Sequence, residues 1–367
     1  MRIAVQGCCH GDLNQVFSKV AQIHERNAID LLLILGDFQS IRDKNDFQSI
    51  SIPKKYQKIG DFKEYYDNDD LKPPVLTLFI GGNHEAMRHL MLLPHGGYVS
   101  RDIYYMGYSN VLWYRGVRIG SLSGIWKQWD FNRERMSWKS IEESHAWLSK
   151  VRELYHVRNS DMLPLFMMDG EERLDIMLSH DWPDGVVYHG DIRGLLRRKP
   201  FFERDVQMRR LGNPKSWQLL RQLKPKWWLS AHLHVRYEAI INHNKRKKND
   251  DELELDLSSE DDRQEATTRF LALDKCLPRR NWLEIIEVEQ DTSHPSYQDR
   301  DTLYWDPEFI SNLQRIAAGD KVSKPVAKSR DEGTDHSQYA IPQYTAGIQR
   351  REQEQTANFI KRFLSNI

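Results

Sequence analysis

The chain has 367 residues, with 53 Lys and Arg residues against 53 Asp and Glu residues, so its formal net charge is zero. Hydrophobic residues make up 40% of the sequence, which suits one large or two ordinary domains with a sizeable core and excludes a chain that is disordered throughout. The neutral balance argues neither for nor against a polyanionic partner, so any such argument depends on local basic clusters.

Cysteine use and hydropathy indicate a soluble, intracellular protein. The three cysteines, Cys8, Cys9 and Cys276, form no disulfide framework, because adjacent Cys8 and Cys9 are poor partners for each other. No apolar run reaches the roughly 18 residues needed to span a bilayer. His10 and Asp12 come too early for a signal peptide. We therefore expect a reducing compartment and no membrane partner.

The chain begins with a strand, a helix and a second strand. A short β-rich run over 1–6 ends in Gly7-Cys8-Cys9-His10-Gly11. Apolar residues at close to helical spacing follow over 13–27, and a continuous Leu and Ile run over 29–35 ends at Gly36-Asp37. This order predicts a βαβ unit, and ligands bind in such folds at the sheet edge where the strand-end loops emerge.

Three later strands are also expected to end in side chains that can ligate metals. The strands over 75–80, 174–178 and 226–229 end in Gly81-Gly82-Asn83-His84-Glu85, Ser179-His180-Asp181 and Ser230-Ala231-His232-Leu233-His234. Two histidines at i and i+2 share one face of a regular strand, and at a strand end they can converge on one or two ions. An isolated pair of this kind is about as often an ordinary surface or core pair.

The rest of the chain changes character several times. The segment 123–158 interleaves aromatic with basic residues, and a basic run with helical character follows at 193–210. The charged stretch 243–266 is expected to be a disordered surface insertion. Strand patterns over 267–290 are expected to complete the sheets, and 291–367 is expected to be a largely helical C-terminal region, with helices at 307–318 and 349–364.

The five strand ends together offer more ligand groups than one tetrahedral ion needs. Two ions sharing a bridging carboxylate are the economical arrangement, and Asp37 is the only carboxylate in the set. We expect one site to be formed by Cys8, His10, Asp37 and His234. We expect the other site to be formed by Asp37, Asn83, His180 and His232.

Each of these residues also has an ordinary structural interpretation. Cys8 alone is more often a small buried hydrophobe than a ligand. Asp37 and Asn83 could cap a turn or a helix, and His180 could be a satisfied core histidine. The ordered recurrence of five motifs favours the metal interpretation over any one of these alternatives.

The series resembles the calcineurin-like metallophosphoesterases, whose pattern runs Asp-x-His, Gly-Asp, Gly-Asn-His-Glu or -Asp, a lone His, and Gly-His-x-His. Within that superfamily the five motifs are similar to those of the RNA lariat debranching enzymes. The motifs cover residues 1 to about 240, and 278–307 resembles the family's C-terminal region. The resemblance implies the α/β (α+β) class, an αββα β-sandwich flanked by helices, with a catalytic domain over 1–242 and a small C-terminal region.

Two residues depart from the superfamily pattern. Cys8 stands where Asp is usual, and Ala231 stands where Gly is usual. A Cys ligand is soft and favours Fe²⁺ or Zn²⁺ over Mg²⁺, with Mn²⁺ as an alternative. It also makes the first site sensitive to oxidation. We therefore expect two divalent ions as cofactors, Fe²⁺ or Zn²⁺ or both.

The resemblance implies hydrolysis of the 2′-5′ phosphodiester at the branch point of excised intron lariats, which linearises them for turnover. His84 is the expected general acid for the leaving 2′ oxygen. The family's lariat-recognition loop falls at about 124–158, and single-stranded RNA is recognised by stacking and phosphate contacts. The expected RNA contacts are Gly124, Trp126, Tyr155, His156 and Arg158. Alternatively, the tryptophans of this segment serve packing alone.

Other interpretations remain open from the sequence. A nuclease or phosphatase of the same superfamily acts on other phosphoesters, and a metal-stabilised binding module has no catalysis. We expect a monomer in the nucleus, with the cytoplasm as a second location and with branched RNA as its partner. The basic run Lys245-Arg246-Lys247-Lys248 is either a nuclear targeting patch or a solvated charge run.

Overall fold

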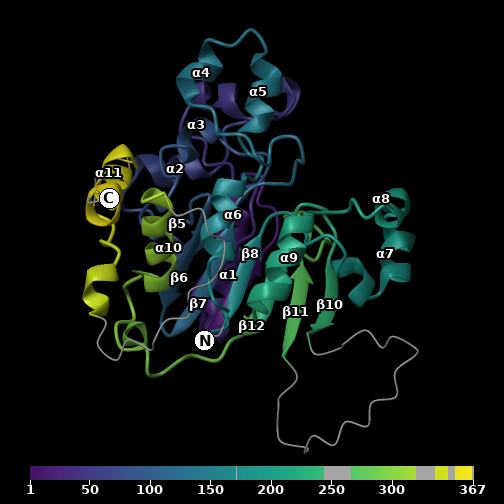
Figure 1. Cartoon of the computed structure of the whole chain (residues 1–367). Coiled ribbons are helices and arrows are strands. Elements are labelled where there is room, and N and C mark those ends of the chain that lie inside the picture. Colours follow the sequence, from purple (N-terminus) through teal and green to yellow (C-terminus); the bar gives the residue numbers. More distant parts are fainter. Residues whose placement is uncertain (171, 244–265, 320–334, 346–351, 366–367) are drawn as a thin grey trace, which may run out of the picture.

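The computed structural model describes residues 1–170, 172–243, 266–319, 335–345 and 352–365. In these residues two mixed β-sheets face each other, and helices flank them (Figure 1). The expected αββα sandwich of the α/β class is therefore confirmed. The predicted insertion over 243–266, including the basic run at 245–248, lies outside the described residues apart from its two end positions.

The first sheet, within the described chain, has six strands. They are β1 (Arg2–Gln6), β2 (Leu31–Ile34), β3 (Thr77–Phe79), β4 (Gly97–Ser100), β5 (Ile103–Tyr105) and β12 (Leu283–Glu287). Their order is β12-β1-β2-β3-β5-β4. β1, β2, β3 and β5 are parallel, and β12 and β4 close the edges antiparallel.

The second sheet follows the same plan, with seven described strands. They are β6 (Ser109–Tyr114), β7 (Val117–Leu122), β8 (Ile176–Ser179), β9 (Trp227–Ser230), β10 (Tyr237–Asn242), β11 (Thr267–Ala272) and β13 (Tyr304–Trp305). Their order is β10-β11-β9-β8-β7-β6-β13, and β7, β8, β9 and β11 are parallel. β11 and β12, from the predicted closing segment, thus complete one sheet each.

The two faces of each strand enter different parts of the core, because side chains alternate along a strand with a period of two. Ile3 and Val5 of β1 pack between the sheets, whereas Ala4 packs outward among residues of the flanking helix layer. Ile176 of β8 likewise points between the sheets and Met177 points outward. Both faces are buried, which explains the continuous apolar runs in the sequence.

Helices cover the outer faces of both sheets. The α-helices are α1 (Leu13–Arg26), α2 (Phe62–Asp67), α3 (Met87–Leu90), α4 (Trp138–Glu142), α5 (Trp147–Glu153), α6 (Asn159–Phe166), α7 (Ile192–Arg198), α8 (Glu203–Gln207), α9 (Pro214–Leu223), α10 (Pro307–Ala317) and α11 (Glu352–Phe363). The 3-10 helices are η1 (Lys44–Ser49), η2 (Lys54–Tyr56), η3 (Val186–His189), η4 (Pro200–Phe202), η5 (Pro295–Tyr297) and η6 (His336–Tyr339).

The predicted helices agree with the structure to different degrees. α10 begins at Pro307 as expected, because the Asp306 side chain accepts a hydrogen bond from the Phe309 N–H and caps it. α11 lies within the predicted 349–364. The basic run 193–210 has the helical character expected, divided into α7, η4 and α8, because Pro200 cannot continue the helix of α7.

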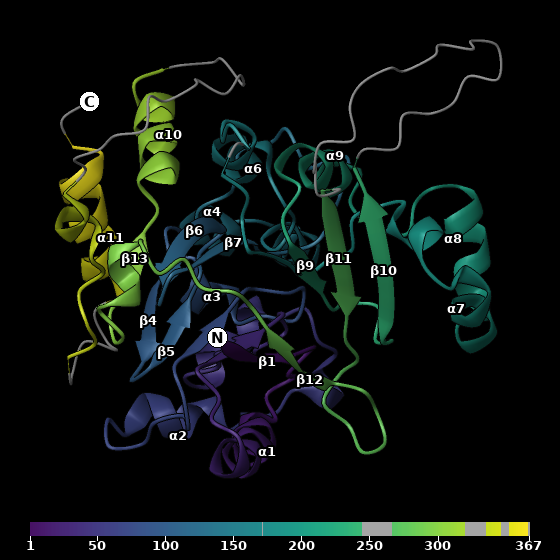
Figure 2. The ribbon, with the colours of Figure 1, turned by 90° about the horizontal axis from the view of Figure 1, so that it is seen from below.

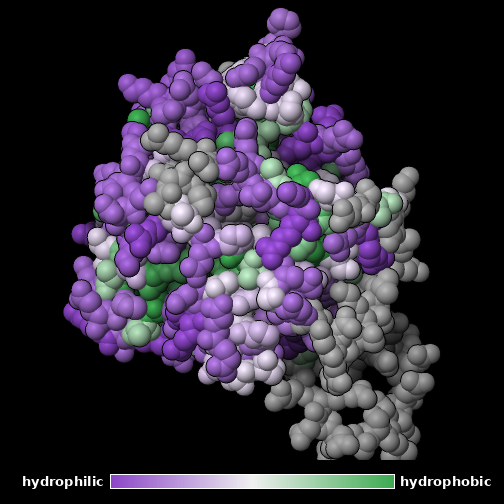
Figure 3. Space-filling view, turned by 90° about the vertical axis from the view of Figure 1, so that its left-hand side faces the viewer, coloured by the Kyte–Doolittle hydropathy of each residue, from purple (hydrophilic) through white to green (hydrophobic). Residues whose placement is uncertain are grey.

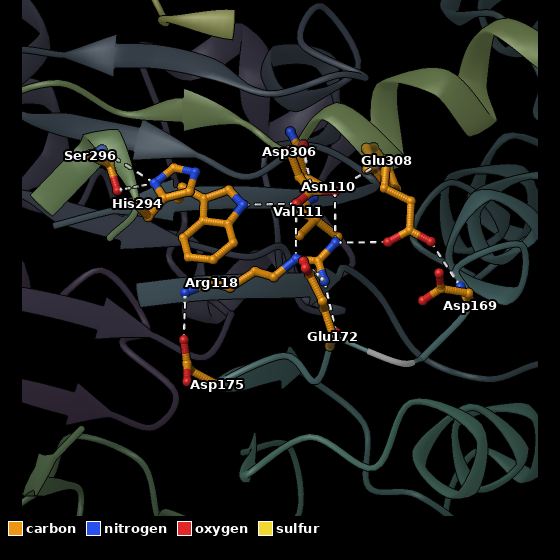
Figure 4. A network of polar contacts seen from close by, with 12 residues as sticks. Asn110, Val111, Arg118, Asp169, Glu172, Asp175, His294, Ser296, Asp306 and Glu308 are labelled. Carbon is orange, nitrogen blue, oxygen red and sulfur yellow. Dashed lines mark hydrogen bonds and ion pairs between the residues drawn. The ribbon is translucent and has the colours of Figure 1, made fainter. Parts of the chain in front are cut away.

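The C-terminal region docks on the second sheet through buried charges (Figure 4). Arg118 of β7 donates to both carboxylate oxygens of Asp306, at 2.9 and 3.0 Å, and to Glu308 at 2.9 Å. The Trp113 indole N–H donates to the same Asp306 at 2.8 Å. A buried ion pair is tolerated when its hydrogen bonds are satisfied, as they are here, so this network fixes the start of α10 against the sheet.

α10 and α11 lie on the opposite side of the molecule from α7 and α8 (Figure 2). On the face that carries the C-terminal helices, the described surface is mostly hydrophilic, with small hydrophobic areas between polar residues (Figure 3). Among the described helices, none combines the length and apolar character that crossing a membrane requires.

Candidate metal centre

The predicted ligands follow the carboxyl ends of five strands. Three of them, β1, β2 and β3, are parallel in the first sheet, and two, β8 and β9, are parallel in the second. Cys8, Asp37 and His180 are buried, whereas His10, Asn83, His84, His232 and His234 are partly exposed. The centre therefore has a buried floor and a rim of imidazoles that a substrate can reach.

The first group contains a thiol, two imidazoles and a carboxylate. Ligand atoms of Cys8, His10, Asp37 and His234 all lie within 4.8 Å of one another. The two Nε2 atoms of His10 and His234 are 3.2 Å apart, and His10 Nε2 is 3.6 Å from Asp37 Oδ2. Among the described residues, buried Asp37 Oδ2 has no hydrogen-bond partner. These converging lone pairs fit a divalent cation.

The second group lies on the other side of the same carboxylate. His180 Nδ1 is 2.7 Å from the Leu35 carbonyl oxygen, which can only accept, so this nitrogen carries the proton. Its Nε2 is then left facing Asn83 Oδ1 at 3.3 Å and Asp37 Oδ1 at 3.6 Å. The His232 ring lies beside it, with ring centroids 5.1 Å apart. Asp37 thus directs one oxygen toward each group.

The backbone at the centre departs from ordinary geometry. His10, Asp37, His232 and His234 have φ values of 54°, 50°, 61° and 50°, in the left-handed region that side-chain-bearing residues rarely adopt. The pair at 232 and 234 follows the end of β9, so its side chains are aimed by two left-handed residues and not by the alternation of a regular strand. Such strain is concentrated at functional sites.

Two glycines let the loops approach each other. A Cβ atom added to Gly36, which has a φ of +108°, would lie 2.2 Å from His180 Nδ1. A Cβ atom added to Gly82 would lie 2.2 Å from Asp37 Oδ1. Both contacts are far inside van der Waals distance, so only glycine permits this assembly.

Electrostatics keeps the imidazoles in their ligating form. Burial lowers the pKa of His180 to about 4 and that of His234 to about 3, so both are neutral at pH 7. Burial alone would raise the pKa of Asp37, but His180 and His10 outweigh it and hold the pKa well below its usual value. Burial and then Asp37 raise the pKa of the Cys8 thiol, and a coordinated cation would reverse that shift.

His84, the predicted general acid, is positioned from two sides. Its backbone N–H donates to Asp37 Oδ1 at 2.8 Å, and its Nδ1 is 3.1 Å from the Ser51 carbonyl oxygen. Because the carbonyl oxygen can only accept, Nδ1 carries a proton, and Nε2 is left to transfer a proton to a substrate. The His84 ring centroid is 5.6 Å from that of His10, beside the first group.

Glu85 has a role that the sequence did not indicate. This buried carboxylate accepts backbone hydrogen bonds from Phe38 and Gln39, both at 2.8 Å, and from Gly82 at 3.0 Å. Burial and the nearby Asp37 raise its pKa, and the three backbone N–H donors oppose that shift. Glu85 therefore ties the Asp37 loop to the Asn83 loop. Its place directly after His84 in the third motif was the available signal.

Three of the five predicted RNA contacts lie beside the centre, two against metal-binding loops and one against Ser51. The contacts join Gly124 N to Gly81 O (2.8 Å), Trp126 N to Asp181 Oδ2 (3.0 Å) and the Tyr155 hydroxyl to Ser51 Oγ (3.5 Å). A groove beside Ser51 is lined by apolar Ile50, Ile52 and Trp147, with Lys54 and Arg152 at its sides. The aromatic segment thus borders the centre.

The other two predicted contacts are used internally. His156 Nδ1 is 2.7 Å from Asp130, and Arg158 is 1% exposed, with one guanidinium nitrogen bonded to the Glu153 carbonyl. Direct contact with RNA would require both side chains to leave these positions. Trp129, which was not among the predicted contacts, is 72% exposed. The spacing of the tryptophans in the sequence does not predict which of them is exposed to solvent.

Known proteins match this chain along most of its length. A family profile described as calcineurin-like phosphoesterase matches residues 1–236, and one described as lariat debranching enzyme, C-terminal domain, matches residues 265–364. The chain is 55% identical to a lariat debranching enzyme of Saccharomyces cerevisiae, over 100% of this chain and 99% of that protein.

More distant relatives carry the same description. The chain is 42% identical to a lariat debranching enzyme of Homo sapiens, over 86% of this chain and 53% of that protein. It is 40% identical to one of Arabidopsis thaliana, over 79% of this chain and 64% of that protein. The chain thus spans nearly all of the yeast protein and about half of the human one.

Proposed function

The chain belongs to the lariat debranching enzyme family, and from this premise we propose that its metal centre hydrolyses the 2′-5′ phosphodiester at the branch point of lariat RNA. It is a metal-dependent phosphodiesterase of the calcineurin-like phosphoesterase fold. The observation that carries the proposal is the position of Asp37, with one carboxylate oxygen toward each group of ligating side chains.

The proposed ligands divide as the sequence suggested. Cys8, His10 and His234 would hold one ion, Asn83, His180 and His232 would hold the other, and Asp37 would bridge them. When bound, two divalent ions lower the pKa of water and stabilise charge on the phosphoryl oxygens. The thiolate and imidazoles favour Fe²⁺ or Zn²⁺. Metal analysis of protein purified without oxygen, before and after chelation, tests this preference.

His84 is the proposed proton donor. In its charged form it carries protons on both ring nitrogens, and Ser51 holds only the one on Nδ1. The Nε2 proton would pass to the 2′ oxygen as the bond from that oxygen to phosphorus breaks and an oxygen from water forms a new bond to phosphorus. The products would be a linear RNA with a free 2′-hydroxyl and an end bearing a 5′-phosphate.

RNA would lie along the aromatic segment beside the centre. We propose that Trp126, Trp129 and the groove at Ser51 contact unpaired bases, since aromatic faces stack on any base. We also propose a nuclear location, because excised introns are released there. A Trp129→Ala variant with weaker binding to branched RNA and an unchanged fold would support the stacking role.

Two comparisons test the proposed function. Cleavage of 2′-5′ branched RNA, 3′-5′ RNA and an aryl phosphate separates a debranching enzyme from a nuclease or a phosphatase. His84→Ala is expected to keep both ions and to lose at least about 100-fold in rate, which is the contribution of a positioned acid. Full activity of this variant with both ions present would rule out the His84 assignment. No turnover with Fe²⁺, Zn²⁺ or Mn²⁺ would favour a binding module.

A further inference from the structure

A basic and aromatic projection lies outside the centre. Helices α7 and α8 stand at the edge of the molecule beside β10 (Figures 1 and 2). Between Arg193 and Arg210 the chain carries seven Arg and Lys residues against two acidic ones, Glu203 and Asp205. The projection is anchored, because Leu195, Phe202 and Val206 are buried in the second core cluster. The charged residues around these anchors are exposed, except Lys199, which is partly buried.

Aromatic side chains lie among these charges. Phe201 is 69% exposed and Tyr188 is 48% exposed, although neither is needed to fill the core. Lys199 Nζ is 5.8 Å from the centre of the Phe201 ring, and Arg209 is 5.9 Å from that of Tyr188. Exposed aromatic faces beside cations are what sequence-tolerant binding of single-stranded nucleic acid requires, because bases stack while phosphates pair.

The projection is connected to the centre by further basic residues. The loop at 274–281 docks on the first metal-binding loop, with Cys276 N donating to Cys8 O at 3.0 Å. On this loop Lys275 directly precedes Cys276, and its backbone N–H donates to Asp274 Oδ1 at 2.7 Å. Lys275 therefore stands on the loop that contacts the backbone of Cys8.

The outer part of the same path reaches α7. Arg280 is paired with Asp274 at 3.1 Å. Burial lowers the pKa of Lys199, and the charges of Asp274, Arg280 and Lys275 all act on it, so the loop lies near the end of α7. Arg198 of α7 donates to the Arg236 carbonyl at 3.1 Å, two residues after His234. A basic strip, defined here as Lys275, Arg280, Lys199 and Phe201, thus runs from the centre to the projection.

We propose that one single-stranded arm of the branched RNA leaves the metal centre over Lys275 and follows the basic strip, with a base stacked on Phe201. The proposal rests on the proposed function, because a branch point joins three strands and its arms must continue beyond the reacting phosphate. The exposed Phe201 ring beside Lys199 favours RNA over an acidic protein partner, because a base can stack on the ring while phosphates pair with the cations.

Substrates of different arm length test this path. A minimal branched RNA with one or two nucleotides per arm is compared with three RNAs in which one arm is extended by about ten. Binding is measured with a chelator present, so that it does not depend on turnover, and cleavage is measured separately with metal. The variant is Lys199→Gln/Phe201→Ser. The control is Lys19→Gln/Ile360→Ser, which removes one exposed cation and one exposed apolar side chain from α1 and α11.

We expect one of the three RNAs with an extended arm to bind the unaltered protein at least about tenfold more tightly than the minimal RNA. This gain in affinity is what one stacked base and one phosphate contact contribute. The variant should lose this gain and should cleave the minimal RNA at the normal rate, which also shows that it is folded. 2-Aminopurine placed along that arm should be quenched at one position, and Phe201→Ser should abolish the quenching.

Two results would overturn the proposal. One is that the variant and the control bind every RNA with an extended arm with equal affinity. The projection would then bind a partner other than RNA. The other is a loss of affinity by the variant that is equally large for the minimal and the extended RNAs. Absence of cleavage in all proteins would reject the proposed function separately, while the chelator measurements would still decide whether the strip binds RNA.

Discussion

The carboxylate of Glu85 accepts a 2.8 Å hydrogen bond from the backbone N–H of Phe38, the residue that follows Asp37. The same carboxylate holds the N–H of Gly82, the residue that precedes Asn83. Two of the metal-binding loops are therefore fixed by one buried side chain that is not among the proposed ligands. Outer contacts of this kind set the geometry of a metal site as much as the ligands do.

Replacing Glu85 with Gln should weaken metal binding. In the unaltered protein, both carboxylate oxygens accept hydrogen bonds from backbone N–H groups. In the variant, the amide NH₂ of Gln is a donor and would face one of these N–H groups, so one hydrogen bond is lost. We expect affinity for Mn²⁺ or Zn²⁺ to fall about 10- to 100-fold, as measured by titration calorimetry. Glu25→Gln, an exposed carboxylate on α1, is the control. Equal affinity of the two variants would show that the loops hold their shape without Glu85.

A methyl group at position 82 should disable the centre. The Cβ atom of Gly82→Ala would lie 2.2 Å from Asp37 Oδ1, so the proposed bridging carboxylate would have to move. Gly81→Ala is a matched control, because its nearest contact is 3.5 Å, an ordinary van der Waals distance. We expect the first variant to lose metal and activity and the second to keep both. If both variants retain metal, Asp37 does not bridge the ions.

The last described helix is joined to the centre by a buried pair. Glu352 of α11 is 3.0 Å from His89 Nε2, and His89 Nδ1 is 2.9 Å from the Ser40 carbonyl, three residues after Asp37. Removing one member of a buried pair leaves the other uncompensated. We therefore expect Glu352→Ala to lower the free energy of unfolding by about 3 kcal/mol in urea titrations.

The control for this change is Glu354→Gln, on the exposed side of the same helix. We also expect Glu352→Ala to weaken metal binding, because the Ser40 loop would be freed. A Glu352→Ala protein with unaltered stability and metal affinity would mean that α11 is not coupled to the centre.

Acid should loosen the same helix through His95. Its ring stacks on Phe359 of α11, with ring centroids 4.4 Å apart, and burial lowers its pKa to about 4. As pH falls through about 6.5, the unfolded chain binds a proton that the folded chain does not bind until about pH 4. Stability is therefore lost between these values.

His95→Phe should remove this share of the pH dependence. Relative to the variant, the unaltered protein should lose up to about 3 kcal/mol between pH 7 and pH 4. The measurement is the free energy of unfolding across that range, with His145→Phe as an exposed control. Parallel curves for the unaltered protein and His95→Phe would show that His95 is already charged in the folded state.

Much of the fold and the metal centre could be predicted because their signals are local. Each predicted ligand follows a buried strand, and parallel strands bring their ends to one edge of a sheet. The two sheets face each other, so His10 after β1 and His234 after β9 meet although 224 residues separate them. The superfamily resemblance supplied the order of the motifs. Counting donors around the one carboxylate, Asp37, indicated two ions.

What the sequence did not predict depends on contacts between distant and irregular segments. Ser51, which holds His84, lies in a polar stretch with no periodicity, and Glu352 meets His89 from the far end of the chain. The burial of Arg158 could not be predicted for a similar reason. A basic residue in an aromatic segment has the same local pattern whether its guanidinium faces RNA or a carbonyl.

One branched RNA provides the most direct test of the proposed chemistry, because it contains a single 2′-5′ linkage among many 3′-5′ linkages. The molecule is labelled on each arm, incubated with protein and Mn²⁺, and its products are identified by mass. We expect cleavage at the 2′-5′ bond alone, giving a linear RNA with a 2′-hydroxyl and a released arm with a 5′-phosphate. Cleavage at 3′-5′ bonds, or an intact branch, would contradict the proposal.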